Sequence, residues 1–240
     1  TLFAAMAEGE QTPWFKVAAE MLATQCKATP PAWARPYTRT DWWVEAVRFP
    51  NWYMPYATGN ATTLEDYARW QTLMMPLYDI VNATPRGLMM WDCQSPNLML
   101  AGDEPTLQNL AIIDHQDARI APVGQDVGLL VRNIRTPRTD PQEEAVVAEL
   151  VARLGLDETT LRRSLAIGAF HHMVRILGGL TRLAVRDERP IPAQNYLART
   201  WEVAEQCAID PYVENDLKAA WAFMEPYRAA GLELLDKERV

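Results

Sequence analysis

The chain contains 240 residues, 49% of them hydrophobic, which is enough to bury the core of one large domain or two small ones. Its formal net charge is −8 and its Arg residues are scattered, so a nucleic-acid-binding surface is not expected. The three Cys residues are too few and too widely spaced for a disulfide framework or a zinc cluster, which favours a reducing cytoplasm. No apolar run approaches the roughly 18 residues that a membrane helix needs, and no signal-peptide pattern is present, so no membrane partner is expected.

Apolar residues recur every three or four positions over most of the chain, which is the spacing of a buried helix face. Between residues 83 and 113 short apolar runs alternate with Pro, Gly, Asn and Asp, so we expect small strands there, with a turn near residues 102–105. The predicted fold class is α+β, mostly α: a helical body with a small β-hairpin insert. Residues 137–141 read as an exposed polar connector. The predicted helices cover residues 14–26, 40–49, 63–82, 125–134, 141–154, 158–187, 193–208 and 212–236.

Three polar residues follow apolar runs in the predicted insert. Asp92 follows the run 88–91, Asn97 lies five positions later, and Asp114 directly follows the run 110–113. A carboxylate can accept the proton of an attacking hydroxyl, and Mg²⁺ prefers carboxylate and carbonyl oxygens while leaving room for substrate phosphates. The spacing therefore predicts a phosphoryl-transfer site with Asp92 as the base, although each residue alone would also fit an ordinary turn.

Other polar residues allow two interpretations. Asp117 either adds a carboxylate near this site or faces solvent, and Asp126 lies at a predicted helix start, where an Asp caps free amides. Glu45, Trp52 and Arg175 are candidate contacts to the acceptor, but aromatic residues at helical spacing are more often part of a core.

Two further features are expected to be structural, and a third is not expected to bind a metal. Cys93 has no suitably spaced His and oxyanion turn, so it is not predicted to be a nucleophile. Gly178-Gly179 follows no strand, which predicts close helix packing and not a phosphate loop. His171-His172 are adjacent on a predicted helix and cannot form the i, i+4 pair that binds a metal, so they are expected to be packing or substrate-side residues.

Four stretches around and after the predicted site, named at the end of this paragraph, together resemble the aminoglycoside phosphotransferase and choline kinase family within the protein-kinase-like fold. The similarity spans most of residues 40–190. The branch that phosphorylates N-acetylmuramate and N-acetylglucosamine at the anomeric position looks most similar, on the evidence of Asp114–Ala118 and of Phe49–Tyr53. The stretches that carry the resemblance are Asp92–Asn97, Ile113–Ala118, Gly124–Leu130 and His172–Leu183.

This resemblance implies transfer of the γ-phosphate of ATP to a hydroxyl of a small molecule, an amino sugar in this branch. Asp92 would be the base, Asn97 and Asp114 would hold Mg²⁺, and Asp126 would brace the catalytic loop. Aminoglycoside or choline phosphorylation is the alternative within the family.

The chain departs from the family pattern at Met90, at Gln94 and His115, and in the part before Asp92. Met90 stands two positions before Asp92, where the family usually has His, and a thioether cannot replace the hydrogen bonds of an imidazole. No stretch before Asp92 resembles a phosphate-covering loop or its Lys, so we expect residues 1–240 to be the C-terminal lobe, with the nucleotide lobe absent from this chain. These departures keep a non-catalytic pseudokinase or interaction module open as an alternative.

Overall fold

The computed structural model describes residues 11–135, 139–187 and 194–237. The chain divides into two compact units, and each is described separately. The first unit comprises residues 1–37 and 80–169, and the second comprises residues 38–79 and 170–240. Helices α5 (Leu64–Val81) and α8 (Glu158–Val185) contribute residues to both units. No helix in the described ranges is long and apolar enough to cross a membrane.

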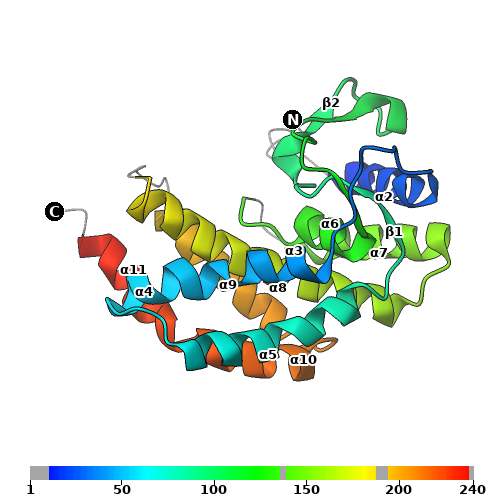
Figure 1. Ribbon diagram of the computed structural model, residues 1–240. Helices are drawn as coiled ribbons and strands as arrows, with labels where there is room; N and C mark the ends of the chain where they lie inside the picture. Colours follow the sequence, from blue (N-terminus) through cyan, green and yellow to red (C-terminus); the bar gives the residue numbers. More distant parts are fainter. Residues whose placement is uncertain (1–10, 136–138, 188–193, 238–240) are drawn as a thin grey trace. The chain divides into compact units, whose positions relative to one another are not determined.

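The first unit is built on helices α2 (Thr12–Lys27), α6 (Val123–Val131) and α7 (Asp140–Leu154), together with the first part of α8. Helix α2 packs against α7 and against strand β1 (Arg86–Met89) (Figure 1). Gly87 allows β1 to approach this closely, since a Cβ there would lie 2.5 Å from the Cα of Cys26. Every residue of α6 is buried, so this helix forms the centre of the unit's core.

Four short strands form two separate antiparallel pairs in the first unit. Strand β1 pairs with β4 (Arg119–Pro122), and β2 (Leu98–Leu100) pairs with β3 (Leu110–Ile112). The β2–β3 pair is the predicted hairpin insert, with bends at residues 101–104 where the turn was expected. Strand β4 was missed, because residues 119–122 end in Pro and pair with a segment 30 to 36 positions earlier.

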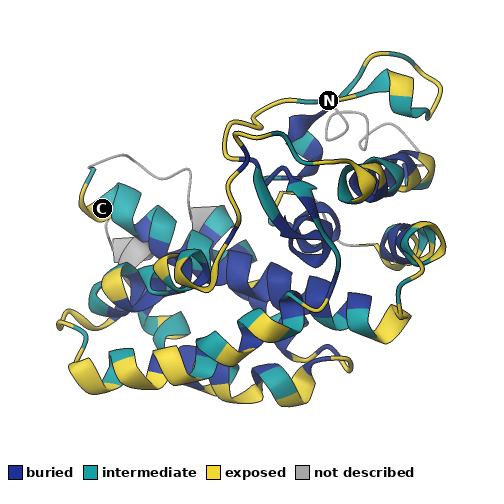
Figure 2. Cartoon of the chain, turned by 45° about the vertical axis from the view of Figure 1, so that its right-hand side comes forward, coloured by how far each residue is buried: buried dark blue, intermediate teal, exposed yellow. Residues whose placement is uncertain are grey.

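The second unit is entirely helical within the described ranges. Helix α3 begins with a capping box between Thr38 and Asp41, and one face of α5 buries Trp70 and Met74 while the opposite face is exposed (Figure 2). Tyr53 and Trp201 lie in its core, where the Trp201 Nε1–H donates to the Tyr53 hydroxyl at 2.8 Å. The helices besides α5 and α8 are α3 (Arg39–Ala46), η1 (Phe49–Tyr53), α4 (Met54–Thr58), α9 (Gln194–Ala208), α10 (Glu214–Met224) and α11 (Pro226–Lys237).

Two of the predicted helices were wrong in detail. The helix expected over 40–49 ends at Ala46, and residues 49–53 form a wider π-helix that continues into α4. The single helix expected over 212–236 is divided at Glu225 into α10 and α11, because Pro226 cannot continue the hydrogen-bonding pattern. The other predicted helices are confirmed to within a few residues at each end. Part of the predicted connector, residues 136–138, lies outside the described residues.

Candidate active site

The β1–β4 pairing closes a loop that carries the three predicted polar residues. Met89 lies opposite Arg119, so residues 90–118 leave and return at the same end of this ladder. Inside the loop, the Ile113 N–H donates to the Asn97 carbonyl at 3.0 Å, directly next to Asp114. The fold therefore brings Asp92, Asn97 and Asp114 into one loop system in the first unit.

Asp92 and Asn97 are in direct contact. The Asn97 Nδ2 donates to the Asp92 carbonyl at 2.9 Å and to its Oδ2 at 3.2 Å, and the Gln94 Nε2 donates to the same Oδ2 at 2.8 Å. Asn97 is buried in the 3-10 helix Ser95–Asn97, whereas Asp92 is only partly buried. Two amide groups thus orient one carboxylate oxygen of Asp92, and the other oxygen has no hydrogen bond within the described residues.

The backbone is strained on both sides of this loop. Trp91 and Asp114 have φ angles of 70° and 61°, and they are the non-glycine residues with positive φ in the described ranges. Such conformations cost on the order of 1–3 kcal/mol each and tend to occur at functional sites. One outlier is the predicted site residue Asp114 and the other directly precedes Asp92, so the local geometry is imposed by the surrounding structure.

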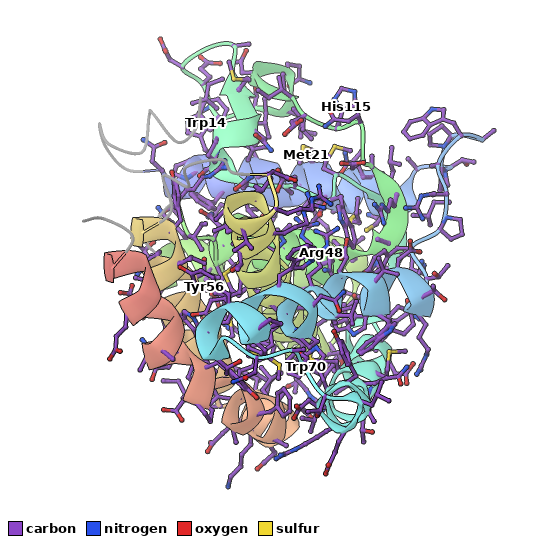
Figure 3. All side chains as sticks on the ribbon, turned by 60° about the vertical axis from the view of Figure 1, so that its left-hand side comes forward. Trp14, Met21, Arg48, Tyr56, Trp70 and His115 are labelled. Carbon is purple, nitrogen blue, oxygen red and sulfur yellow. The ribbon has the colours of Figure 1, made fainter. Side chains whose placement is uncertain are left out.

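Asp114 and its neighbours lie at the surface. The Asp114 carboxylate accepts a hydrogen bond from the Gln116 Nε2 at 2.7 Å, and Asp117 is also exposed. His115, which follows Asp114, carries its imidazole at the surface as well (Figure 3). The accessible carboxylate of Asp114 is available to a ligand.

Asp126 holds the backbone just before Asp92. The N–H groups of Met90 and Trp91 donate to its two carboxylate oxygens, at 2.5 and 3.1 Å, and the residue is fully buried. Helix α6 has no side-chain cap at its N-cap residue, Pro122. The Asp126 carboxylate binds the loop, which is the bracing role that the family resemblance implies. Local spacing could not identify these donors, because they lie 35 and 36 positions earlier; only the family resemblance indicated that Asp126 braces this loop.

The donor set fits Mg²⁺ bound together with phosphates, and does not fit a metal held by protein alone. No group of three or more His, Cys, Asp or Glu side chains in the described ranges could hold a metal ion. The Nδ2 of Asn97 donates to Asp92, which leaves the side-chain oxygen of Asn97 as a candidate metal ligand. Asp114 adds a carboxylate. Mg²⁺ in phosphoryl-transfer sites typically takes one or two carboxylates and completes its shell with water and phosphate.

Cys93 lies next to Asp92 but cannot act as a nucleophile at neutral pH. Burial raises the pKa of its thiol well above the usual range, and the nearby carboxylates of Asp126 and Asp92 raise it further. A neutral, buried thiol is unreactive. The structure therefore agrees with the structural interpretation of this residue.

The three candidate acceptor contacts all belong to the second unit. Glu45 and Arg175 are brought together, with 3.6 Å between the Oε1 and Nη1 atoms, and Trp52 lies half-buried in the π-helix. His171 is buried nearby, with its ring stacked on Trp42 at 3.6 Å between centroids. Burial lowers the pKa of His171 to about 3, so it packs as a neutral ring, as expected for a structural histidine.

A mostly helical chain with small antiparallel sheets and a loop of this composition is consistent with a protein-kinase-like phosphotransferase. The chain belongs to the phosphotransferase enzyme family, whose model matches residues 14–163. This region contains every predicted residue of the loop system, Asp92 to Asp126.

Relatives that match at the sequence level are N-acetylmuramate/N-acetylglucosamine kinases. The protein from Caulobacter vibrioides is 29% identical over 155 residues, which cover 63% of this chain and 42% of the relative. The protein from Pseudomonas aeruginosa is 27% identical over 154 residues, covering 61% and 44%. The chain thus matches less than half the length of these curated relatives.

A solved structure supports the fold. The choline/ethanolamine kinase family protein from Mesorhizobium loti superposes with a TM-score of 0.59, covering 91% of this chain and 67% of that protein, at 15% sequence identity. At this identity the likeness concerns the fold alone. It agrees with the predicted resemblance to the aminoglycoside phosphotransferase and choline kinase family.

Proposed function

We propose that this chain carries the catalytic and acceptor-binding part of an ATP-dependent kinase that phosphorylates a hydroxyl of an amino sugar. The observation that carries the proposal is the oriented Asp92 carboxylate, hydrogen-bonded to Asn97 inside a loop that also brings in Asp114. Membership of the phosphotransferase family and the names of the matching relatives support the reaction class and the acceptor.

The proposed reaction needs one base and one charged site. The free carboxylate oxygen of Asp92 takes the proton of the acceptor hydroxyl as that oxygen forms a bond to the γ-phosphorus. The bond between the γ-phosphorus and the bridging oxygen breaks, and ADP leaves with the electron pair. Because Asn97 and Gln94 hold the carboxylate in one orientation, less activation free energy is needed to position it in the transition state.

Asn97 and Asp114 are the residues proposed to hold Mg²⁺, through one amide oxygen and one carboxylate. When bound, the ion would neutralise charge on the phosphates of ATP. The strained φ of Asp114 supports this role, because the backbone conformation fixes the direction in which the side chain leaves the main chain. Asp117 stays a candidate for a supporting carboxylate.

For the acceptor, the proposal keeps Glu45, Trp52 and Arg175. Glu45 is buried and charge-paired with Arg175, and the Trp52 indole offers an apolar face of the kind that stacks on sugar rings. Replacement of Trp52 by Ala should then raise KM for the acceptor and leave kcat within a few-fold of the original value.

The test is ADP release by the full-length protein with Mg-ATP and N-acetylglucosamine, N-acetylmuramate, choline or kanamycin as acceptor. The proposal expects turnover with an amino sugar and its loss in the Asp114→Ala variant. Turnover with choline or kanamycin alone would move the acceptor to the alternative class. Neither turnover nor a thermal shift with Mg-ATP would favour the non-catalytic alternative that Met90 raises.

A further inference from the structure

One cationic side chain and two aromatic rings form a cluster next to Asp92, and the loop hydrogen bonds described above give this cluster no role. The rings of Tyr37 and Trp91 are 4.1 Å apart between centroids and inclined at 48°. The guanidinium carbon of Arg119 lies 4.8 Å from the centroid of Trp91 and 5.9 Å from that of Tyr37. Tyr37 and Trp91 are buried, and Arg119 is partly buried. We call these three residues the Trp91 clamp.

We propose that Arg119 is a positioning residue that acts through Trp91 to hold the Asp92 loop in its catalytic conformation. This inference rests on the proposed function of Asp92 as the base. Trp91 immediately precedes Asp92, so any rotation of the Trp91 backbone moves the Asp92 carboxylate directly.

The need for such a clamp follows from the backbone. Trp91 has a φ of 70°, a conformation that a bulky residue leaves unless the surrounding structure opposes it. Asp126 accepts a hydrogen bond from the Trp91 N–H, which holds the main chain. Contact of the indole with a ring and a cation restrains the side chain, and such cation–π contacts strengthen when they are shielded from water.

Backbone contacts keep the clamp itself in place. Arg119 lies opposite Met89 in the β1–β4 ladder and its Nε donates to the Asp117 carbonyl at 3.3 Å. The Tyr37 N–H donates to the Ile120 carbonyl at 2.9 Å. Arg86 donates to the carbonyls of both Tyr37 and Ile120, at 2.6 and 2.7 Å. The two sides of the clamp are therefore joined to the same strand, β4.

The clamp also accounts for a loop without the usual histidine. Met90 supplies no side-chain hydrogen bond at the position two before Asp92. In this chain the restraint comes from the neighbouring residue, through ring and cation contacts of Trp91 and backbone bonds to Asp126. Sequence spacing could not reveal this arrangement, because Arg119 is 28 positions from Trp91.

The experiment compares Arg119→Met, which keeps the aliphatic stem, with Arg119→Lys, which keeps a cation. Arg153→Ala serves as the control, since Arg153 is an exposed residue of α7 paired with Glu20 and Glu149. Two readouts are taken: kcat and KM with Mg-ATP and N-acetylglucosamine, and hydrogen–deuterium exchange of the peptide over residues 88–97. We expect Arg119→Met to lower kcat about tenfold with KM unchanged and to speed exchange in that peptide, with Arg119→Lys in between.

The two readouts separate failure of the clamp from failure of the proposed function. Exchange and kcat in Arg119→Met that match the Arg153→Ala control would overturn the clamp, as would a fall in kcat without faster exchange. Faster exchange in a protein whose unsubstituted form shows no turnover would support the restraint of the loop by Arg119 and refute the kinase assignment instead. If Arg119→Met did not fold, Arg119→Lys would decide, since loss of the planar group alone should still loosen the loop.

Discussion

Substitution of Asp126 is the sharpest test of how the loop that carries Asp92 is held. The substitution Asp126→Asn keeps the size of the side chain but replaces one carboxylate oxygen with an amide group. That group would then face a backbone N–H of Met90 or Trp91, two donors that now bind Asp126 at 2.5 and 3.1 Å in a fully buried position. One charge-assisted hydrogen bond is lost and one buried donor is left without a partner.

The magnitude follows from these two losses. A hydrogen bond to a charged group contributes about 1.5–3 kcal/mol, and leaving a buried donor unpaired costs a similar amount, so we expect Asp126→Asn to lower the free energy of unfolding by about 3 kcal/mol. Urea unfolding followed by circular dichroism measures this value. The same variant should speed hydrogen exchange in residues 88–97.

Asp157→Asn is the matched control. Asp157 also accepts two hydrogen bonds, from the N–H and the hydroxyl of Thr160 at 2.7 and 2.8 Å, but it is exposed at the start of α8. Asn serves nearly as well as Asp at a helix N-terminus, so little stability should be lost. Equal effects of the two substitutions would refute the reasoning, because burial of the Asp126 contacts would then contribute nothing.

Three further predictions concern packing and titration. Gly178→Ala should lower the free energy of unfolding in urea by about 1–3 kcal/mol, because a Cβ there would lie 2.2 Å from a backbone oxygen. A Cβ at Gly179 would meet nothing within 4 Å, so Gly179→Ala should be neutral or stabilising. A Gly179→Ala variant that was less stable than Gly178→Ala would contradict this packing. The pKa of His171 is lowered to about 3 in the folded state, so between about pH 6.5 and pH 3 the unfolded chain binds a proton at this residue and the folded chain does not. The free energy of unfolding should therefore fall with decreasing pH in this range more steeply than in His171→Phe. Parallel pH curves for the two proteins would refute this prediction. The Cys93 thiol, whose pKa is raised by burial, should resist iodoacetamide at pH 8 until urea unfolds the protein, and peptide mapping that found Cys93 labelled in the folded state would disprove it.

The sequence predicted the elements whose signal is local. The helices before and after the insert show apolar faces at regular spacing, and the turn near residues 102–105 has the residues that turns require. The π-helix over 49–53 was not predictable in this way, because Phe49 and Tyr53 continue an apolar pattern and only the hydrogen-bonding register differs.

The contacts between distant positions escaped prediction. The pairing of β1 with β4, the hydrogen bonds from the Met90 and Trp91 amides to Asp126, and the contact of Arg119 with Trp91 each join residues more than 25 positions apart. Local spacing identified Asp92, Asn97 and Asp114 as candidates, but only the family resemblance indicated that Asp126 braces their loop, and neither indicated Arg119. Tertiary packing decides what holds the loop, and single-sequence patterns do not report it.

The most direct test of the central claim compares Asp92→Asn with Asp103→Asn, a conservative change at an exposed bend of the same insert. Each protein is assayed for ADP release with Mg-ATP and N-acetylglucosamine, and its folding is checked by urea unfolding. If Asp92 accepts the acceptor proton, Asp92→Asn should lower kcat by about 100- to 10,000-fold with little change in stability, while Asp103→Asn stays close to the unsubstituted protein. An Asp92→Asn variant that turned over at the rate of the Asp103→Asn control would contradict the assignment of this loop as the catalytic site.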